Sequence, residues 1–160
     1  MNPERSADQI RDRLSGVSEL YNRLLLVVGP TGSGKTSALR AFSDQDKCPI
    51  VNVGVELSRR LLDLTERQRI IELPSLLAEL IQESRSDVVV LDNTEILFDP
   101  VLKQDPLRLL MGLSRNRTVV VSWLGVLDGQ SLTYAAPQHP EFRRYPSERL
   151  LVVRLVDSKG

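Results

Sequence analysis

Residues 24–36 join a hydrophobic run to a glycine-rich segment whose spacing suits it to phosphate chemistry. The run L-L-L-V-V leads directly into G-P-T-G-S-G-K-T over residues 29–36. A glycine-rich turn from a buried strand into a helix leaves successive backbone N–H groups pointing into one concavity, and the helix N-terminus adds positive partial charge. We therefore expect a phosphate-binding loop, and its predicted members are Gly29, Pro30, Thr31, Gly32, Ser33, Gly34, Lys35, Thr36 and Ser37.

Three side chains extend this prediction to a magnesium nucleotide. Lys35 should bring its charge to the β- and γ-phosphates, and the Thr36 hydroxyl should ligate Mg²⁺. Asp92 ends the hydrophobic run V-V-V-L-D at residues 88–92, a Walker B pattern in which the carboxylate holds Mg²⁺ through water. The sequence therefore predicts ATP and Mg²⁺ as cofactors, with Thr36 and Asp92 as the metal ligands.

Hydrolysis of a bound nucleotide would also need a group that orients water. Glu95 is the nearest carboxylate after Asp92, and it could polarise a water molecule or simply be an acidic residue at the start of a helix. Asn93 follows Asp92 directly and could position the water instead, although more slowly, because an amide cannot accept the proton. The sequence leaves both residues as candidates.

Four further residues are candidates from their places beside predicted strands. Ser122 follows the fourth strand and could contact the γ-phosphate or only end the strand. Asn52 lies near the end of the second strand, where it could hold a catalytic carboxylate or act as a turn residue. Arg143 and Arg144 precede the last strand, and they could enter a neighbouring subunit's site as arginine fingers or remain on the surface.

The hydrophobic runs that position these residues alternate with helical patterns. Strands are predicted at residues 24–28, 49–53, 87–91, 118–121 and 149–156. Such alternation predicts a three-layer α/β fold, with helices on both faces of a five-stranded parallel sheet. The expected fold class is a P-loop NTPase of the ASCE type with strand order 5-1-4-3-2, in which the fourth strand lies between the first and the third.

The remaining segments complete one predicted domain over residues 1–160. Residues 1–22 should form an N-terminal helix that leads into the core. A helix is expected over residues 73–81, with Pro74 in its first turn. Residues 125–148 contain two glycines and three prolines, which predict a long loop region before the last strand, and no C-terminal helical lid is expected after that strand.

The composition narrows the classes of function. With 41% hydrophobic and 26% charged residues, the chain should be a soluble globular protein. The 21 Lys and Arg residues balance the 21 Asp and Glu residues, so no overall field attracts nucleic acid or a membrane. Cys48 is the only cysteine, which fits a reducing cytoplasm, and the single His139 makes a zinc site a poor prediction. Without a signal peptide or an apolar span, we expect a cytoplasmic protein that does not enter a membrane.

The chain resembles the BrxF family, small P-loop ATPases of BREX phage-defence systems. The resemblance depends on L-L-L-V-V-G-P-T-G-S-G-K-T, on V-G-V-E-L-S-R-R-L-L-D-L-T-E-R-Q-R at residues 53–69, and on V-V-V-L-D-N-T-E-I-L-F at residues 88–98. It implies an intracellular bacterial nucleotide-binding protein that acts with other BREX components against phage DNA. The chain also resembles an AAA+ core without its lid. The expected partners are other BREX components, a second copy with the site at a subunit interface, and DNA bound weakly or indirectly.

Three functions remain open on the sequence. The first is a Mg²⁺-dependent ATPase that serves a larger assembly and turns over slowly in isolation. The second is a small-molecule or nucleotide kinase, in which residues 125–148 would form a mobile lid. The third is a nucleotide-binding adaptor that has lost hydrolysis, as Asn93 would indicate. Strand order separates the first two, because a kinase places the Asp92 strand directly beside the strand that precedes the phosphate loop.

Overall fold

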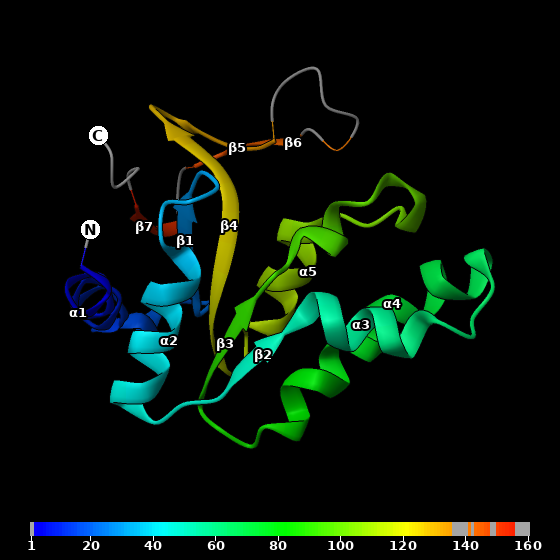
Figure 1. The fold of residues 1–160 in the computed structure, drawn as a ribbon, viewed down its shortest axis with the longest axis horizontal. Helices are drawn as coiled ribbons and strands as arrows, with labels where there is room; N and C mark the ends of the chain where they lie inside the picture. Colours follow the sequence, from blue (N-terminus) through cyan, green and yellow to red (C-terminus); the bar gives the residue numbers. More distant parts are fainter. Residues whose placement is uncertain (1, 136–140, 142, 148–149, 156–160) are drawn as a thin grey trace.

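A parallel sheet covered by helices on both faces organises the chain (Figure 1). The structure is a computed structural model, and it describes residues 2–135, 141, 143–147 and 150–155. The parallel strands follow the order β2-β3-β4-β1-β7 across the sheet. Their bounds are Leu24–Gly29 (β1), Ile50–Asn52 (β2), Val88–Asp92 (β3), Thr118–Asp128 (β4) and Leu151–Arg154 (β7).

This strand order confirms the predicted fold class. β4 lies between β1 and β3, with Val27 paired with Ser122 on one side and Leu91 paired with Val121 on the other. The order expected of a nucleotide kinase, with β3 directly beside β1, is therefore wrong for this chain. Because all five strands are parallel, their carboxyl ends share one edge of the sheet, where ligands of such folds bind.

Five α-helices in the described part of the chain cover the sheet, and the face that each covers follows from the alternation of residues along the strands (Figure 1). Leu25 and Val27 of β1 face the core shared with α1 and α2, whereas Leu24 and Leu26 face the core shared with α3, α4 and α5. The helices span Pro3–Leu14 (α1), Lys35–Asp46 (α2), Val53–Leu61 (α3), Glu66–Glu83 (α4) and Pro106–Leu113 (α5). Within the described ranges, no helix has both the length and the hydrophobicity that a membrane span requires.

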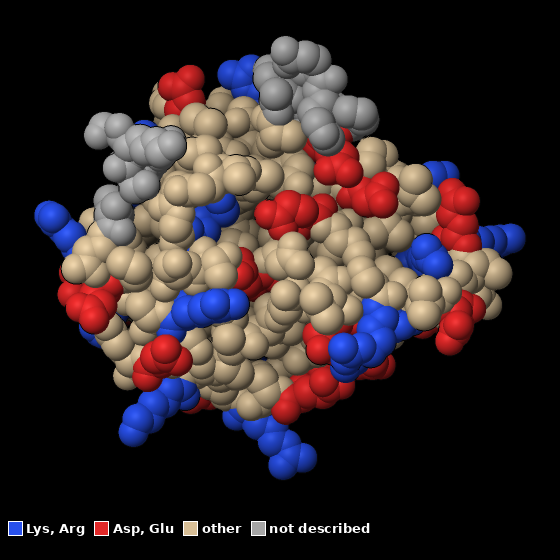
Figure 2. Space-filling view, in the orientation of Figure 1, with Lys and Arg blue, Asp and Glu red and all other residues tan. Residues whose placement is uncertain are grey.

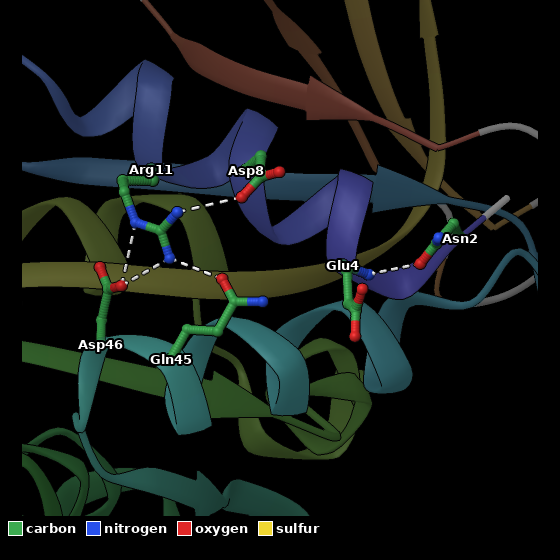
Figure 3. Close-up of polar contacts among 6 residues, drawn as sticks. All are labelled: Asn2, Glu4, Asp8, Arg11, Gln45 and Asp46. Carbon is green, nitrogen blue, oxygen red and sulfur yellow. Dashed lines mark hydrogen bonds and ion pairs between the residues drawn. The ribbon is translucent and has the colours of Figure 1, made fainter.

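Arg11 links α1 to the C-terminal end of α2 (Figure 3). Its Nε and Nη2 atoms donate to Asp46 Oδ1 at 3.0 and 2.7 Å, and Nη2 also donates to Gln45 Oε1 at 2.6 Å. At the other end of α1, Asn2 Oδ1 accepts the Glu4 backbone N–H at 2.9 Å and caps the helix. α1 thus runs along α2 on the sheet face that both helices cover.

The N-terminal helix is shorter than the predicted segment. α1 ends at Leu14, because Gly16 adopts a left-handed φ of +83° that no helix continues. A short 3-10 helix at Val17–Glu19 follows. The chain then enters β1 through two exposed apolar residues, Leu20 and Tyr21, whose exposed fractions are 47% and 72%.

The helix predicted over residues 73–81 is present within α4, but the prediction that Pro74 lies in its first turn is wrong. α4 begins eight residues earlier at Glu66, because Thr65 and Gln68 form a capping box there. A proline inside a helix leaves the carbonyl four residues earlier without its usual donor. Here that carbonyl belongs to Ile70, and Gln104 Nε2 donates to it at 2.9 Å. A side chain from outside the helix therefore compensates for the missing N–H.

The loop predicted over residues 125–148 is also wrong for its described part. β4 continues to Asp128, and the chain then forms two antiparallel strands, Ser131–Tyr134 (β5) and Arg143–Pro146 (β6). Gly129 makes the turn with a φ of +56°, and Gly125 is part of a strand. The rest of the predicted loop, residues 136–140, 142 and 148, lies outside the described residues.

An aromatic cluster packs this hairpin against the sheet edge. The rings of Phe98 and Tyr134 stack with centroids 3.5 Å apart, and the Trp123 ring lies edge-on to Phe98 at 4.9 Å. Trp123 Nε1 also donates to the backbone oxygen of Thr133 at 3.0 Å, so the indole satisfies its only donor. The cluster joins β4 and β5 to the 3-10 helix η2 at Glu95–Phe98.

Gly125→Ala should destabilise the hairpin. A Cβ at this position would lie 1.8 Å from the Thr133 backbone oxygen, so the strands would have to separate. We expect the free energy of unfolding in urea to fall by about 1–3 kcal/mol. Gly112→Ala in α5 is the matched control, because nothing lies within 4 Å of its added Cβ and alanine favours a helix. Equal stability of the two variants would contradict the close approach of β4 and β5.

Candidate functional site

The predicted phosphate loop leaves β1 and enters α2 in the expected place. Gly29 ends β1, and Lys35 is the first residue of α2. Gly32 and Gly34 have φ values of +82° and +91°, a left-handed conformation that other residues seldom adopt. No atom outside the loop lies within 4 Å of a Cβ built on either glycine, so the space above the loop is open. The turn therefore has the shape of a phosphate cradle at a helix N-terminus.

Thr36 and Asp92 meet directly, although 55 residues separate them in the sequence. The Thr36 hydroxyl donates to Asp92 Oδ2 at 2.9 Å. Thr36 lies in the first turn of α2, and Asp92 ends β3, so the insertion of β4 between β1 and β3 sets the distance between them. The structure thus brings the two predicted metal ligands to one point.

Lys35 folds back over the loop that precedes it. Its Nζ atom donates to the backbone oxygens of Gly29 and Pro30, both at 2.9 Å. Burial lowers the pKa of Lys35, whereas the negative charges of Glu95 and Asp92 act in the opposite direction. The ammonium group therefore lies between the loop and two carboxylates, where an anionic ligand would further favour its charged form.

A cavity of about 520 Å³ opens between these residues at the carboxyl edge of the sheet. Eleven of its lining residues are candidates from the sequence: Thr31, Gly32, Gly34, Lys35, Thr36, Ser37, Asn52, Asp92, Asn93, Glu95 and Ser122. Gly29, Pro30 and Ser33 belong to the loop but do not line the cavity. Arg40 and Leu124 complete the lining.

Glu95 has an unusual environment for a carboxylate. Its Oε2 atom is buried and has no hydrogen-bond partner among the described residues. Glu95 begins η2, and Phe98 anchors the far end of that short helix in the aromatic cluster. A buried carboxylate oxygen without a partner is costly unless a ligand or water satisfies it. Glu95 is thus held at the cavity with one acceptor atom unused by the described residues.

Asn93 connects the end of β3 to α3. Its Nδ2 atom donates to Asn52 Oδ1 at 2.9 Å, and its backbone oxygen accepts the Gly54 N–H at 2.9 Å. Asn52 Oδ1 also caps α3 by accepting the Val55 N–H at 3.1 Å. Asn52 therefore pairs with an amide and caps a helix at the end of β2, and of its two predicted roles the structure shows no carboxylate partner among the described residues.

Ser122 is buried and lines the cavity from β4, with an exposed fraction of 2%. Its backbone oxygen accepts the Thr94 hydroxyl at 2.7 Å, which ties the segment after Asp92 to β4. This bond holds Ser122 close to Thr94, the residue before Glu95, and both Ser122 and Glu95 line the cavity. Its predicted contact with a γ-phosphate stays a prediction.

Arg143 and Arg144 do not line the cavity. Arg143 Nη2 donates to the Gln104 backbone oxygen at 2.8 Å, and Arg144 Nε donates to Ser131 Oγ at 3.2 Å. Both guanidinium groups lie on β6 and contact the body of the same chain. Their predicted entry into a neighbouring subunit's site stays a prediction.

Arg40 is a cavity residue that the sequence analysis missed. It follows Thr36 by four positions in α2, so the two side chains lie on the same face of the helix. The four-residue spacing from Thr36 could have identified Arg40 from the sequence, since a cation one helical turn after the loop faces the same cavity. Arg40 and Lys35 are the two cations in the described lining.

The site offers two protein oxygens to a metal, as in magnesium sites where a bound nucleotide and water supply the other ligands. No group of three or more His, Cys, Asp or Glu residues that could hold a metal occurs in the described part of the chain. Mg²⁺ typically uses one or two protein oxygens and takes the rest from phosphates and water. The Thr36 hydroxyl and the Asp92 carboxylate are oxygens of that kind.

Comparisons with known proteins give information about the fold. No protein-family model matches the sequence, and no curated protein matches it either. Among solved structures, the chain is similar to a DNA replication initiation factor, with a TM-score of 0.51 and 15% identity over 92% of this chain and 44% of that one. It is also similar to PCH-2 from C. elegans, with a TM-score of 0.49 and 15% identity over 93% of this chain and 41% of that one. The chain spans less than half the length of these proteins. The likeness to the replication initiation factor concerns the fold, and the strand order is that of an ASCE P-loop core.

The left-handed conformation of Asn93 predicts a difference between two substitutions. Its φ is +55°, and both Asn93→Gly and Asn93→Ala remove its hydrogen bond to Asn52. Glycine adopts this conformation without strain and alanine does not. The free energy of unfolding in urea should therefore be about 1 kcal/mol lower for Asn93→Ala than for Asn93→Gly. If alanine proved as stable as glycine, the segment after Asp92 would not have the conformation described.

Proposed function

We propose that this chain binds Mg²⁺-ATP and hydrolyses it slowly as a component of a bacterial anti-phage defence system of the BREX type. The observation that carries the biochemical part is the contact between Thr36 Oγ1 and Asp92 Oδ2 at 2.9 Å, beside Lys35 at the N-terminus of α2. The BREX assignment is supported by the sequence resemblance alone. With it come the proposed cytoplasmic location and the proposed partnership with other BREX components.

The residues of the cavity fit a magnesium triphosphate. Backbone N–H groups of the loop and the Lys35 ammonium would hold the phosphates, and Thr36 and Asp92 would hold the metal, Asp92 through water. Mg²⁺ would supply positive charge to neutralise the phosphates and orient them. The open space above Gly32 and Gly34 leaves room for the phosphates to approach the backbone.

Glu95 is our candidate for the residue that orients the attacking water. Its buried Oε2 has no partner among the described residues, and the aromatic cluster fixes the helix that carries it. A carboxylate in this position can hold a water molecule and accept its proton. Asn93 is a weaker candidate, because its amide already donates to Asn52.

The site should be slow in isolation because it offers little positive charge to the transition state. Lys35 and Arg40 are the cations in the described lining, whereas hydrolysis by such folds gains much of its rate from an additional arginine. Arg143 or Arg144 of a second copy, or an arginine of another component, would have to supply it. We propose that assembly accelerates turnover.

Any association with DNA is proposed to be weak or indirect. Figure 2 shows Lys and Arg interspersed with Asp and Glu over the face drawn there, without a large field of positive charge. Nucleic-acid binding depends on many phosphate contacts from clustered cations. The balanced net charge of the chain agrees with this surface.

The second candidate function is a nucleotide-binding adaptor without hydrolysis. It is favoured by Asn93, which stands directly after Asp92 and uses its amide in a structural contact to Asn52. Phosphate release from ATP, measured over a range of protein concentrations, separates the two candidates. Release that rises with concentration supports the ATPase, and none at any concentration supports the adaptor.

Lys35→Ala should abolish nucleotide binding, because it removes the cation nearest the loop. The affinity for a fluorescent ATP analogue with Mg²⁺ should fall by at least about a hundredfold, as expected for a buried charge contact with phosphate. Arg59→Ala is the matched control, since it removes an exposed cation from α3. Similar affinity in the two variants would exclude Lys35 from the binding site.

Glu95→Gln should separate binding from turnover. The amide keeps the size of the side chain but cannot accept a proton, so ATP affinity should stay within about twofold while phosphate release falls by about a hundredfold. Glu72→Gln, an exposed glutamate in α4, provides the matched control. Unchanged phosphate release by the Glu95 variant would remove this residue from the mechanism.

A further inference from the structure

The described part of the connection between β4 and β7 contains no helix. Parallel strands are usually joined by a helix that packs on the sheet between them. The described residues of this connection instead form β5 and β6. In the strand order β2-β3-β4-β1-β7, the chain moves in one direction across the sheet from β2 to β3 and from β3 to β4. It moves in that same direction from β4 to β7. Right-handed crossovers in one direction place their helices on one face of the sheet, which here is the face of α3, α4 and α5. In the described part of the β4–β7 connection, no helix lies on that face.

An apolar groove occupies this position at the amino end of β1 and β7. We define the β1–β7 groove by Leu20, Tyr21, Leu24, Leu26, Met111 and Leu151, which line a cavity of about 590 Å³. Its described lining contains no charged side chain. Leu24 and Leu26 of β1 lie at its base and are buried, so Leu20, Tyr21, Met111 and Leu151 supply its exposed apolar surface. An uncharged, largely apolar lining suits an apolar partner better than a polar ligand.

The rim of the groove is preformed and exposed. Leu20 and Tyr21 are adjacent, and their exposed fractions of 47% and 72% are high for large apolar residues. Asn22 fixes this segment to α5 by donating from Nδ2 to the Met111 backbone oxygen at 2.7 Å. The Arg23 backbone N–H, which donates to the Ser114 oxygen at 2.8 Å, adds a second tie.

Two arginines give the rim its charge. The Arg115 guanidinium lies 5.1 Å from the centroid of the Tyr21 ring, and Arg23 Nη2 donates to the Arg115 backbone oxygen at 3.1 Å. Neither guanidinium forms an ion pair with a residue in the described part of the chain. An occupant with carboxylates beside its apolar face would complement both the floor and the rim.

We propose that the β1–β7 groove binds one amphipathic helix of a partner protein, with leucine-type residues on one face and acidic residues flanking them. The helix would take the place that a crossover helix takes in other parallel sheets, as in helix-in-groove recognition. A second copy of this chain fits less well. Its exposed apolar residues Val55, in α3, and Leu62, directly after α3, flank Arg59, whose charge has the same sign as those of Arg23 and Arg115.

The groove is separate from the nucleotide site. β1 runs from Leu24 in the groove to Gly29 at the phosphate loop, a distance of roughly 17 Å along a strand of this length. Substitutions on the rim should therefore leave nucleotide affinity unchanged, and the two sites can be tested independently.

The test uses a fluorescein-labelled synthetic peptide of about 18 residues, long enough for a stable helix. The peptide carries Leu at helical spacing on one face and Glu beside it, and a matched peptide carries Lys in place of Glu. The full chain should bind the Glu peptide saturably and the Lys peptide at least about tenfold more weakly. Amide signals of residues 20–24 and 150–151 should shift in an NMR titration with the Glu peptide.

Variants of the rim sharpen the test. Tyr21→Ser should weaken binding of the Glu peptide by about tenfold. Leu62→Ser, which changes a similarly exposed apolar residue directly after α3, should leave binding unchanged. Arg115→Glu should weaken the Glu peptide and strengthen the Lys peptide, a reversal that misfolding could not produce. No saturable binding, equal affinity for both peptides, or a dimer lost on Tyr21→Ser would overturn the proposal. Nucleotide affinity, measured in parallel, reports on the proposed ATPase site alone.

Discussion

The hydrogen bond between Thr36 and Asp92 is the contact on which the site depends. One partner belongs to the helix that follows β1, and the other ends β3 on the far side of β4. The two side chains meet because β1, β4 and β3 run parallel, so the loop after β1 and the end of β3 lie at the same edge of the sheet. The same arrangement places Lys35, Glu95 and Asn93 around one cavity. The parallel sheet thus brings the site together, and the loop sequence supplies its phosphate-binding groups.

The parts of the fold that follow from local patterns could be predicted from the sequence. The unbroken apolar runs of β1 and β3 indicated strands buried on both faces, and the glycine spacing located the turn into α2. The short polar connections between strands and helices then left few ways to arrange the sheet. The candidate residues Lys35, Thr36 and Asp92 could be identified from the sequence for the same reason, since each lies at the end of a predicted strand or helix.

The features that depend on distant contacts could not be predicted. Gly125 resembles a loop residue in the sequence, but it lies in β4, where only a residue without Cβ lets Thr133 approach. Pro74 is accommodated inside α4 because Gln104 supplies the missing donor from elsewhere in the chain. Asn93 was considered for its chemistry, whereas its left-handed backbone and its pairing with Asn52 became visible only in three dimensions.

A crystal structure with a non-hydrolysable ATP analogue and Mn²⁺ would test the central claim most directly, because anomalous scattering locates the ion. We expect one manganese peak beside the phosphate loop, bound by the Thr36 hydroxyl and by two phosphate oxygens, with Asp92 held to it through water. Binding of the ion would replace the direct contact between Thr36 and Asp92. An ion bound elsewhere, or phosphates bound away from the N-terminus of α2, would contradict the account.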